Sequence, residues 1–231
     1  RPAIHAVEQF VHAGYPLDAE ALLIVELDGP AAEVDQLIER VSAIARKNQA
    51  ASIRASNSED ERLLFWAGRK AAFPAVGRIS PDYLCMDGTI PRKRLGEMLT
   101  AIYAMEKKYR LRCINVFHAG DGNLHPLILF DANDPDQLHR CELFGADILE
   151  TSVAMGGTVT GEHGVGIEKL NSMCVQFTPD EREQMEGVKH AFDPAGTLNP
   201  GKVIPTLQRC AEYGKMHVKK GLLPFPELER F

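Results

Sequence analysis

CINVFHAGDGNLHPLILF, residues 113–130, is a segment in which apolar residues flank a glycine-rich turn. The Asp121-Gly122 pair is a strong signal for a two-residue hairpin turn, so the stretch predicts two antiparallel strands. Counting outward from this turn pairs His118 with His125. Directly opposed residues have Cβ atoms about 4.5–5.5 Å apart, close enough for two neutral imidazoles to share a cation. Two ordinary histidines at the end of a hairpin would show the same spacing.

The segments around this hairpin repeat one pattern of elements. Strand, helix and strand patterns occupy 82–90, 91–110 and the hairpin, and an earlier set occupies 21–29, 31–49 and 50–56. This duplication predicts an α+β fold, a ferredoxin-like duplicated antiparallel sheet with packed helices. Further helical patterns at 58–73, 136–157 and 178–192 add a helix between the two sets and a C-terminal helical segment. Ser58 with Glu61, and Thr178 with Glu181, have the spacing of capping boxes.

Composition excludes several classes of protein. The chain has 231 residues, 45% hydrophobic and 25% charged, with a net charge of −6, which is ordinary for a globular protein. Mixed charge without a basic stripe argues against nucleic acid as a partner. No apolar run approaches the roughly 20 residues of a membrane-spanning helix. The five cysteines are scattered and never in CxxC spacing, which predicts reduced thiols and a cytoplasmic location.

A second cluster changes the interpretation of the two histidines. It is GGTVTGEHGVGIEK, residues 156–169, where Glu162 and His163 lie among glycines that let the backbone approach a ligand closely. Glycine-rich loops are also flexible connections, but those seldom carry an adjacent carboxylate and imidazole. His118, His125 and Glu162 would form a three-ligand set that leaves coordination positions open, as catalytic metal sites do. His163 would then remain as an acid or base beside the metal.

Two arginines are candidates for binding an acid substrate. Arg69 follows Phe65 and Trp66 in a helical pattern, and Arg78 lies beyond it. A guanidinium is the best planar, bidentate partner for a carboxylate, although a solvated arginine on an amphipathic helix is the commoner case. The segment 191–203, AFDPAGTLNPGKV, by itself shows only turn chemistry.

Three motifs together carry a resemblance to a known family. HAGDGNLHP (118–126), TGEHGVGIEK (160–169) and FDPAGTLNPGK (192–202) resemble the C-terminal domain of FAD-linked oxidases of the vanillyl-alcohol oxidase type. That family includes D-lactate and D-2-hydroxyglutarate dehydrogenases. Within it, residues 68–92, 116–133 and 217–231 are similar to the FAD-linked subunits of bacterial glycolate oxidases.

The resemblance implies a domain organisation and partners. It implies a substrate domain at 1–204 and a tail at 205–231, with FAD held mainly by an N-terminal FAD-binding domain that is absent from this chain. It also implies a second flavin-like subunit and an iron–sulfur subunit, with peripheral association at the inner membrane through them. The tail would be either a docking strip for these subunits or a segment covering its own domain. Its apolar residues are Leu222, Leu223, Phe225 and Phe231.

The resemblance also implies roles for individual residues. His118, His125 and Glu162 would hold a divalent metal (Zn, Mn or Fe), and His163 would take the proton of the substrate hydroxyl. Arg69 would bind the substrate carboxylate with assistance from Arg78. Asn199 and Lys202 are candidates for contacts with the flavin edge.

Two departures from the D-2-hydroxyglutarate branch indicate the substrate. Cys85 stands where that branch has a substrate-binding lysine, and Leu127 stands where it has a substrate asparagine. The expected activity is therefore FAD-dependent oxidation of a small monocarboxylic 2-hydroxyacid, glycolate or D-lactate. Two alternatives stay open: a flavin-independent metal enzyme, because two histidines and a carboxylate serve other chemistries, and a ligand-binding regulatory module.

Overall fold

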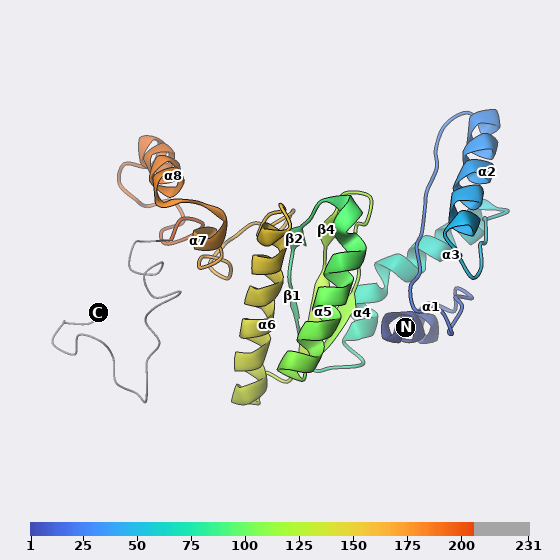
Figure 1. The fold of residues 1–231 in the computed structure, drawn as a ribbon, viewed down its shortest axis with the longest axis horizontal. Coiled ribbons are helices and arrows are strands. Elements are labelled where there is room, and N and C mark those ends of the chain that lie inside the picture. Colours follow the sequence, from blue (N-terminus) through green and yellow to red (C-terminus); the bar gives the residue numbers. More distant parts are fainter. Residues whose placement is uncertain (206–231) are drawn as a thin grey trace. The chain divides into compact units, whose positions relative to one another are not determined.

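The computed structural model describes residues 1–205, which divide into two compact units, 1–83 and 84 onward (Figure 1). The first unit contains four helices within the described residues: α1 (Pro2–Val11), α2 (Ala31–Lys47), α3 (Glu59–Lys70) and α4 (Ala72–Val76). Helix α1 buries its apolar face and packs on α3 and α4. Next to this contact, the Tyr15 hydroxyl donates a 2.5 Å hydrogen bond to the Phe65 carbonyl.

The predicted start of α3 is confirmed, with one difference in detail. The Ser58 hydroxyl accepts a hydrogen bond from the Glu61 N–H at 3.2 Å, as an N-cap does. The Glu61 carboxylate, however, accepts from the Asn57 N–H at 2.8 Å, one residue before the position that a capping box requires. In the second unit the complete capping box of Thr178 and Glu181 is present.

The strands predicted in the first unit do not form. Segments 21–29 and 50–56 are irregular, and Leu23 in the first of them is 72% exposed. A β-strand is held by hydrogen bonds to a neighbouring strand. An apolar, β-branched run indicates only that a segment could pair with another strand, and does not show that such a strand is present. Of the first strand–helix–strand set, the structure therefore retains the helix α2.

The second unit contains the sheets and the core. Strands β1 (Asp82–Cys85), β5 (Pro126–Phe130) and β3 (Arg112–Asn115) form a sheet in the order β1-β5-β3, and β5 is antiparallel to β3. A smaller antiparallel pair joins β2 (Gly88–Thr89) to β4 (Asn123–Leu124). This arrangement of helices on antiparallel strands confirms the α+β class.

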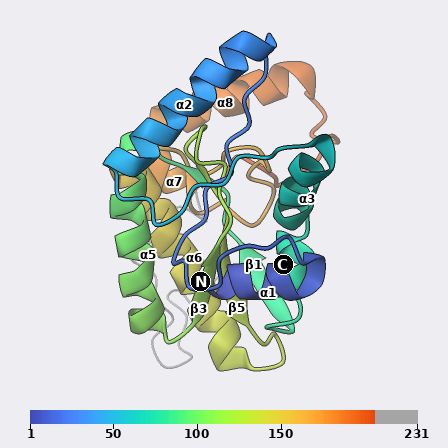
Figure 2. The ribbon, with the colours of Figure 1, turned by 90° about the vertical axis from the view of Figure 1, so that its right-hand side faces the viewer.

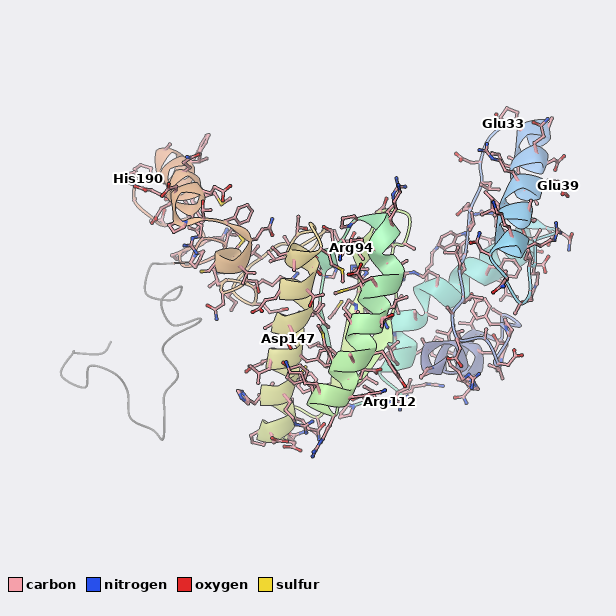
Figure 3. All side chains as sticks on the ribbon, in the orientation of Figure 1. Glu33, Glu39, Arg94, Arg112, Asp147 and His190 are labelled. Atoms are coloured by element: carbon pink, nitrogen blue, oxygen red, sulfur yellow. The ribbon has the colours of Figure 1, made fainter. Side chains whose placement is uncertain are left out.

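Two long helices cover the three-stranded sheet. Helix α5 (Leu95–Tyr109), which follows a short 3-10 turn, contacts β3, and α6 (Pro135–Ala154) contacts β5; the two helices lie side by side in Figures 1 and 2. Asp147, labelled in Figure 3, joins them by accepting hydrogen bonds from Lys108 Nζ at 2.6 Å and the Tyr109 hydroxyl at 2.5 Å. The core between helices and sheet is apolar and includes Met98, Ile102, Leu124, Ile128, Phe144 and Ile148.

The hairpin forms, but its register differs from the prediction. Residues 119–122 make a four-residue turn, because His118 pairs with Asn123 and His125 lies opposite Val116. The register is thus shifted by two residues, which keeps every side chain on its predicted face since strands alternate with period two. Gly122 has the positive φ of +73° that favours glycine, and its carbonyl accepts from the Ile90 N–H at 3.0 Å. This hydrogen bond from Ile90, the residue that follows β2, holds the turn at four residues.

The remaining described residues follow α6. A glycine-rich loop leads to α7 (Met173–Gln176) and α8 (Pro179–Phe192), so the expected C-terminal helical segment is present. Cys85, Cys113 and Cys141 are free thiols, whereas Cys174 is disulfide-bonded, so the expectation of reduced cysteines is wrong at Cys174. Within residues 1–205, every helix is too short or too polar to cross a membrane.

Candidate metal centre

Three imidazoles converge on one carboxylate oxygen in the second unit. Glu162 Oε1 lies 2.9 Å from His125 Nε2, 3.9 Å from His118 Nε2 and 3.8 Å from His163 Nε2. The ring of His125 stands perpendicular to that of His118, with centroids 5.3 Å apart, and is parallel to that of His163 at 4.9 Å. The structure thus brings together all four residues that the sequence predicted for the metal site.

Two parts of the chain supply these residues. The hairpin supplies His118 at its turn and His125 between β4 and β5, and the glycine-rich loop supplies Glu162 and His163. A bridge between Thr89 and Thr158, with N–H to carbonyl distances of 3.0 and 3.2 Å, attaches the loop to β2, which pairs with the hairpin. Gly157 permits this approach, because a Cβ there would lie 1.8 Å from the Thr89 carbonyl oxygen.

The site is closed on one side and open on the other. The side chain of His125 is 3% exposed, whereas those of His118, His163 and Glu162 are 46%, 48% and 52% exposed. Burial lowers the pKa of His125, and the nearby Glu162 carboxylate opposes this only in part. A neutral imidazole is the form that binds a metal. The arrangement therefore offers a buried nitrogen ligand and an accessible carboxylate.

Asp87 is a site residue that sequence reasoning missed. It is fully buried, and Asp87, His125, Glu162 and His163 each have a ligand atom within 4.8 Å of the others. Burial alone would raise the pKa of Asp87, but hydrogen bonds from the His163 N–H, the Thr160 hydroxyl and the Glu162 N–H hold it well below the usual range. The available signal was a carboxylate inside the strand pattern at 82–90.

A cavity of about 260 Å³ adjoins His163, and its other lining residues are Cys85 and residues 164–169. Burial raises the pKa of the Cys85 thiol to about 11, so the thiol facing the cavity is neutral at physiological pH. Leu127 is fully buried in β5. Neither position supplies a cation or amide to a ligand.

The other predicted residues lie elsewhere. Arg69 is on α3 and Arg78 follows α4, where its guanidinium lies 5.1 Å from the centroid of the Phe10 ring; both belong to the first unit, and their substrate roles stay predictions. Asn199 and Lys202 are exposed after α8. The Val203 N–H donates to the Gly166 carbonyl at 2.9 Å, so this segment adjoins the glycine-rich loop.

Comparison with known proteins identifies the family. The model for "FAD linked oxidases, C-terminal domain" matches residues 1–203. The chain belongs to the FAD-linked oxidase C-terminal domain family. Its relatives include glycolate oxidase subunit GlcD of Escherichia coli K12, which is 60% identical over 99% of this chain and 46% of the relative. GlcD of Bacillus subtilis is 36% identical over 88% of this chain and 43% of the relative.

More distant family members agree with this assignment. A probable mitochondrial D-lactate dehydrogenase of Danio rerio is 30% identical over 90% of this chain and 42% of the relative. The chain thus spans less than half the length of these relatives. The solved structure of a 4-ethylphenol oxidase from Gulosibacter chungangensis is similar to this one with a TM-score of 0.53, and the match covers 78% of this chain and 38% of the oxidase chain. At 16% identity this likeness concerns the fold.

Proposed function

We propose that this chain is the substrate-binding and catalytic domain of an FAD-dependent dehydrogenase that oxidises a small 2-hydroxyacid, glycolate or D-lactate, to the 2-oxoacid. The observation that carries the proposal is the convergence of His118, His125 and His163 on Glu162 beside a cavity of about 260 Å³. The relatives named glycolate oxidase subunit and D-lactate dehydrogenase support this substrate class.

The donor set fits a divalent cation. Two imidazoles and one carboxylate are ligands that Zn²⁺, Mn²⁺ and Fe²⁺ accept, and three protein ligands leave positions open for substrate. His125 contributes a buried nitrogen whose lowered pKa favours the neutral form, and Glu162 contributes an accessible oxygen. We assign His118, His125 and Glu162 as the ligands.

The residues of the chain then divide the work. When bound, the cation supplies Lewis acidity to the substrate hydroxyl, and FAD supplies the acceptor for the hydride that leaves the α-carbon. His163 accepts the hydroxyl proton at Nε2, the atom that faces Glu162. Arg69 holds the substrate carboxylate in a bidentate pair, assisted by Arg78, and so orients the α-carbon.

The cavity supports a monocarboxylic substrate. Pockets for drug-sized ligands have volumes of about 300–1,000 Å³, so this cavity suits a smaller molecule. A second carboxylate would need a cation to offset its desolvation. Cys85 on the cavity wall is a neutral thiol, and the ammonium of Lys169, which also lines the cavity, is paired with the Asp87 carboxylate.

We propose the remaining organisation from the family. Residues 1–204 form the substrate domain, an N-terminal domain holds FAD, and Asn199 and Lys202 contact the flavin edge beside the glycine-rich loop. The tail, residues 205–231, docks on a second flavin-like subunit and an iron–sulfur subunit; all of it after residue 205 lies outside the described residues. The complex is cytoplasmic and associates peripherally with the inner membrane.

The test compares metal content and turnover in the full-length protein. Glu162→Ala, like His118→Ala and His125→Ala, removes a ligand and should release the metal, with activity falling in proportion. His163→Ala should retain the metal and lose roughly 10²- to 10⁴-fold in turnover, because a positioned base contributes about that much.

His139→Ala on the exposed side of α6 is the matched control and should change neither quantity. Loss of metal from His163→Ala with retention in Glu162→Ala would reverse the two roles. Metal-free wild-type protein with full activity would remove the metal from the proposal. The chain 1–231 expressed alone should be colourless, because it has no glycine-rich dinucleotide fingerprint; stoichiometric flavin would contradict this.

A further inference from the structure

One buried carboxylate gathers the backbone of the loop that carries Glu162 and His163. Asp87 accepts hydrogen bonds from the Thr160 hydroxyl at 2.8 Å, the Gly161 N–H at 3.0 Å, the Glu162 N–H at 3.1 Å and the His163 N–H at 2.9 Å. Consecutive N–H groups that point to one place form an anion-binding nest. Here the anion is a side chain of the protein itself, from the segment between β1 and β2.

Lys169 completes this arrangement from the other end of the loop. Its side chain is 4% exposed, and its Nζ lies 3.3 Å from both the backbone oxygen and Oδ2 of Asp87. Buried charges are costly unless they are paired and hydrogen-bonded, and this pair meets both conditions. Asp87 therefore contacts the loop at two places, residues 160–163 and Lys169.

The contacts of Asp87 argue for a different role from that of Glu162. A carboxylate has about four lone-pair positions, and those of Asp87 are directed at five donor groups: one hydroxyl, three N–H groups and one ammonium. All five donors contact Oδ2, whereas Oδ1 accepts only from the Glu162 N–H and lies 3.6 Å from His125 Nε2. Glu162, by contrast, is half exposed and faces the imidazoles. Through Oδ2, Asp87 thus holds the backbone and the lysine of the loop, as a positioning carboxylate does.

The loop has little freedom to take another path. A Cβ on Gly161 would lie 2.5 Å from Asn123 Oδ1 and 2.9 Å from Asp87 Oδ1, so the backbone is pressed between the hairpin and the carboxylate. The Gly161 N–H also donates to the Asp87 backbone oxygen at 2.9 Å. Because the N–H groups of Glu162 and His163 both donate to Asp87, the side chains of these two neighbouring residues lie together beside His125.

We propose that Asp87 and Lys169 form a buried positioning pair that holds residues 160–163, so that Glu162 binds the cation and His163 reaches the substrate. Asp87 is a positioning residue because it acts through the loop. This inference rests on the proposed function for the roles of Glu162 and His163, and it goes beyond it in assigning the element that arranges them. Partners that orient metal ligands typically contribute about 10- to 100-fold to metal affinity.

The experiment uses the full-length protein with Asp87→Asn as the variant and Asp193→Asn as the matched control. Asp193 is also a buried aspartate that accepts from a lysine and from two backbone N–H groups, those of Thr197 and Leu198. Both substitutions place an NH₂ group against N–H donors and leave a lysine without its carboxylate. They differ in that Asp193 lies at the end of α8, and its partners Lys189, Thr197 and Leu198 are outside the glycine-rich loop.

Two measurements are made on each protein after circular dichroism has shown that it is folded. Competition between the protein and a chelator gives the Kd for Zn²⁺ and for Mn²⁺, and Asp87→Asn should weaken both by about 10- to 100-fold. Hydrogen exchange in the metal-free protein should show faster exchange of the amides of Gly161, Glu162 and His163. Asp193→Asn should leave the Kd and these three amides unchanged.

A folded Asp87→Asn variant with wild-type Kd and wild-type amide protection overturns the proposal. If that variant does not fold, Thr160→Val decides, because it removes one donor to Asp87 without altering charge. It should weaken metal binding about 2- to 10-fold, the usual net effect of one hydrogen bond; no change in Kd or exchange overturns the proposal. Wild-type protein that binds neither cation refutes the proposed metal site instead, and amide exchange alone then tests the positioning pair.

Discussion

Replacing Gly122 by alanine should destabilise the hairpin that carries His118 and His125. Gly122 has φ of +73°, which costs an L-residue about 1–2 kcal/mol. A Cβ there would also lie 2.2 Å from the carbonyl oxygen of Ile90. Both partners are backbone, so relief requires the turn to move, at a typical cost of about 1–3 kcal/mol. Together these effects predict a loss of about 2–5 kcal/mol in the free energy of unfolding.

Two other glycines separate the causes. An alanine at Gly120 would meet nothing within 4 Å and needs no positive φ, so Gly120→Ala should be close to neutral. Gly164 has φ of +85° and open space, so Gly164→Ala should cost about 1–2 kcal/mol, the conformational part alone. For a domain of this size, a loss of 2–5 kcal/mol corresponds to roughly 4–20 °C in Tm.

The assay is thermal unfolding of the full-length variants by circular dichroism, followed by Zn²⁺ competition at a temperature where all are folded. The expected order of Tm is Gly120→Ala highest, Gly164→Ala intermediate and Gly122→Ala lowest. Zn²⁺ should bind more weakly to Gly122→Ala than to Gly120→Ala, because the turn positions His118. A Tm of Gly122→Ala within about 2 °C of that of Gly120→Ala would refute the reasoning, since it corresponds to less than about 1 kcal/mol.

Three further predictions concern the core, the acid stability and the metal. Phe144 is fully buried and stacks on Tyr109 at 5.4 Å, so Phe144→Ala should cost about 3–5 kcal/mol in denaturant unfolding, whereas Leu143→Ala, at a 44% exposed position, should cost about 0.5 kcal/mol or less. The pKa of Asp193 is lowered from 3.8 to about 2, mainly by a hydrogen bond from Lys189 and to a smaller extent by those from the N–H groups of Leu198 and Thr197. The charged carboxylate therefore stabilises the folded state above about pH 4, and this stabilisation is lost as the pH falls toward 2. Asp193→Asn should therefore flatten the stability profile in that range, and an unchanged profile would contradict this. Removing the metal with a chelator should lower the Tm of the wild type. If the free metal concentration was 100 times Kd, the lost stability is about 2.7 kcal/mol. The Tm of His125→Ala should not change on chelation.

Local signals in the sequence determined much of what the structure contains. The capping residues Ser58 and Thr178 accept the predicted hydrogen bonds from the N–H groups three residues later. The Asp121-Gly122 turn and the alternation of the strands placed His118 and His125 on a common face. Each of these features depends on residues a few positions apart, whose conformational preferences act before any distant contact forms.

The residues of the proposed metal centre were also accessible to sequence reasoning, for a different reason. Histidines and a carboxylate among glycines are unusual in composition, and the family resemblance assigned the same residues. The sequence therefore named His118, His125, Glu162 and His163 as partners, and the structure places them around one oxygen atom.

Tertiary structure decided what depends on distant partners. The hairpin register follows from the contact between Gly122 and Ile90. The segments 21–29 and 50–56 form no strands, because a strand needs a neighbouring strand and the pattern of a segment does not show whether one is present. Asp87 shows the same limit most clearly. Its hydrogen-bond donors are 73 to 82 positions away in the sequence, so its role arises only when the fold brings the glycine-rich loop onto β2 and buries the carboxylate beneath it.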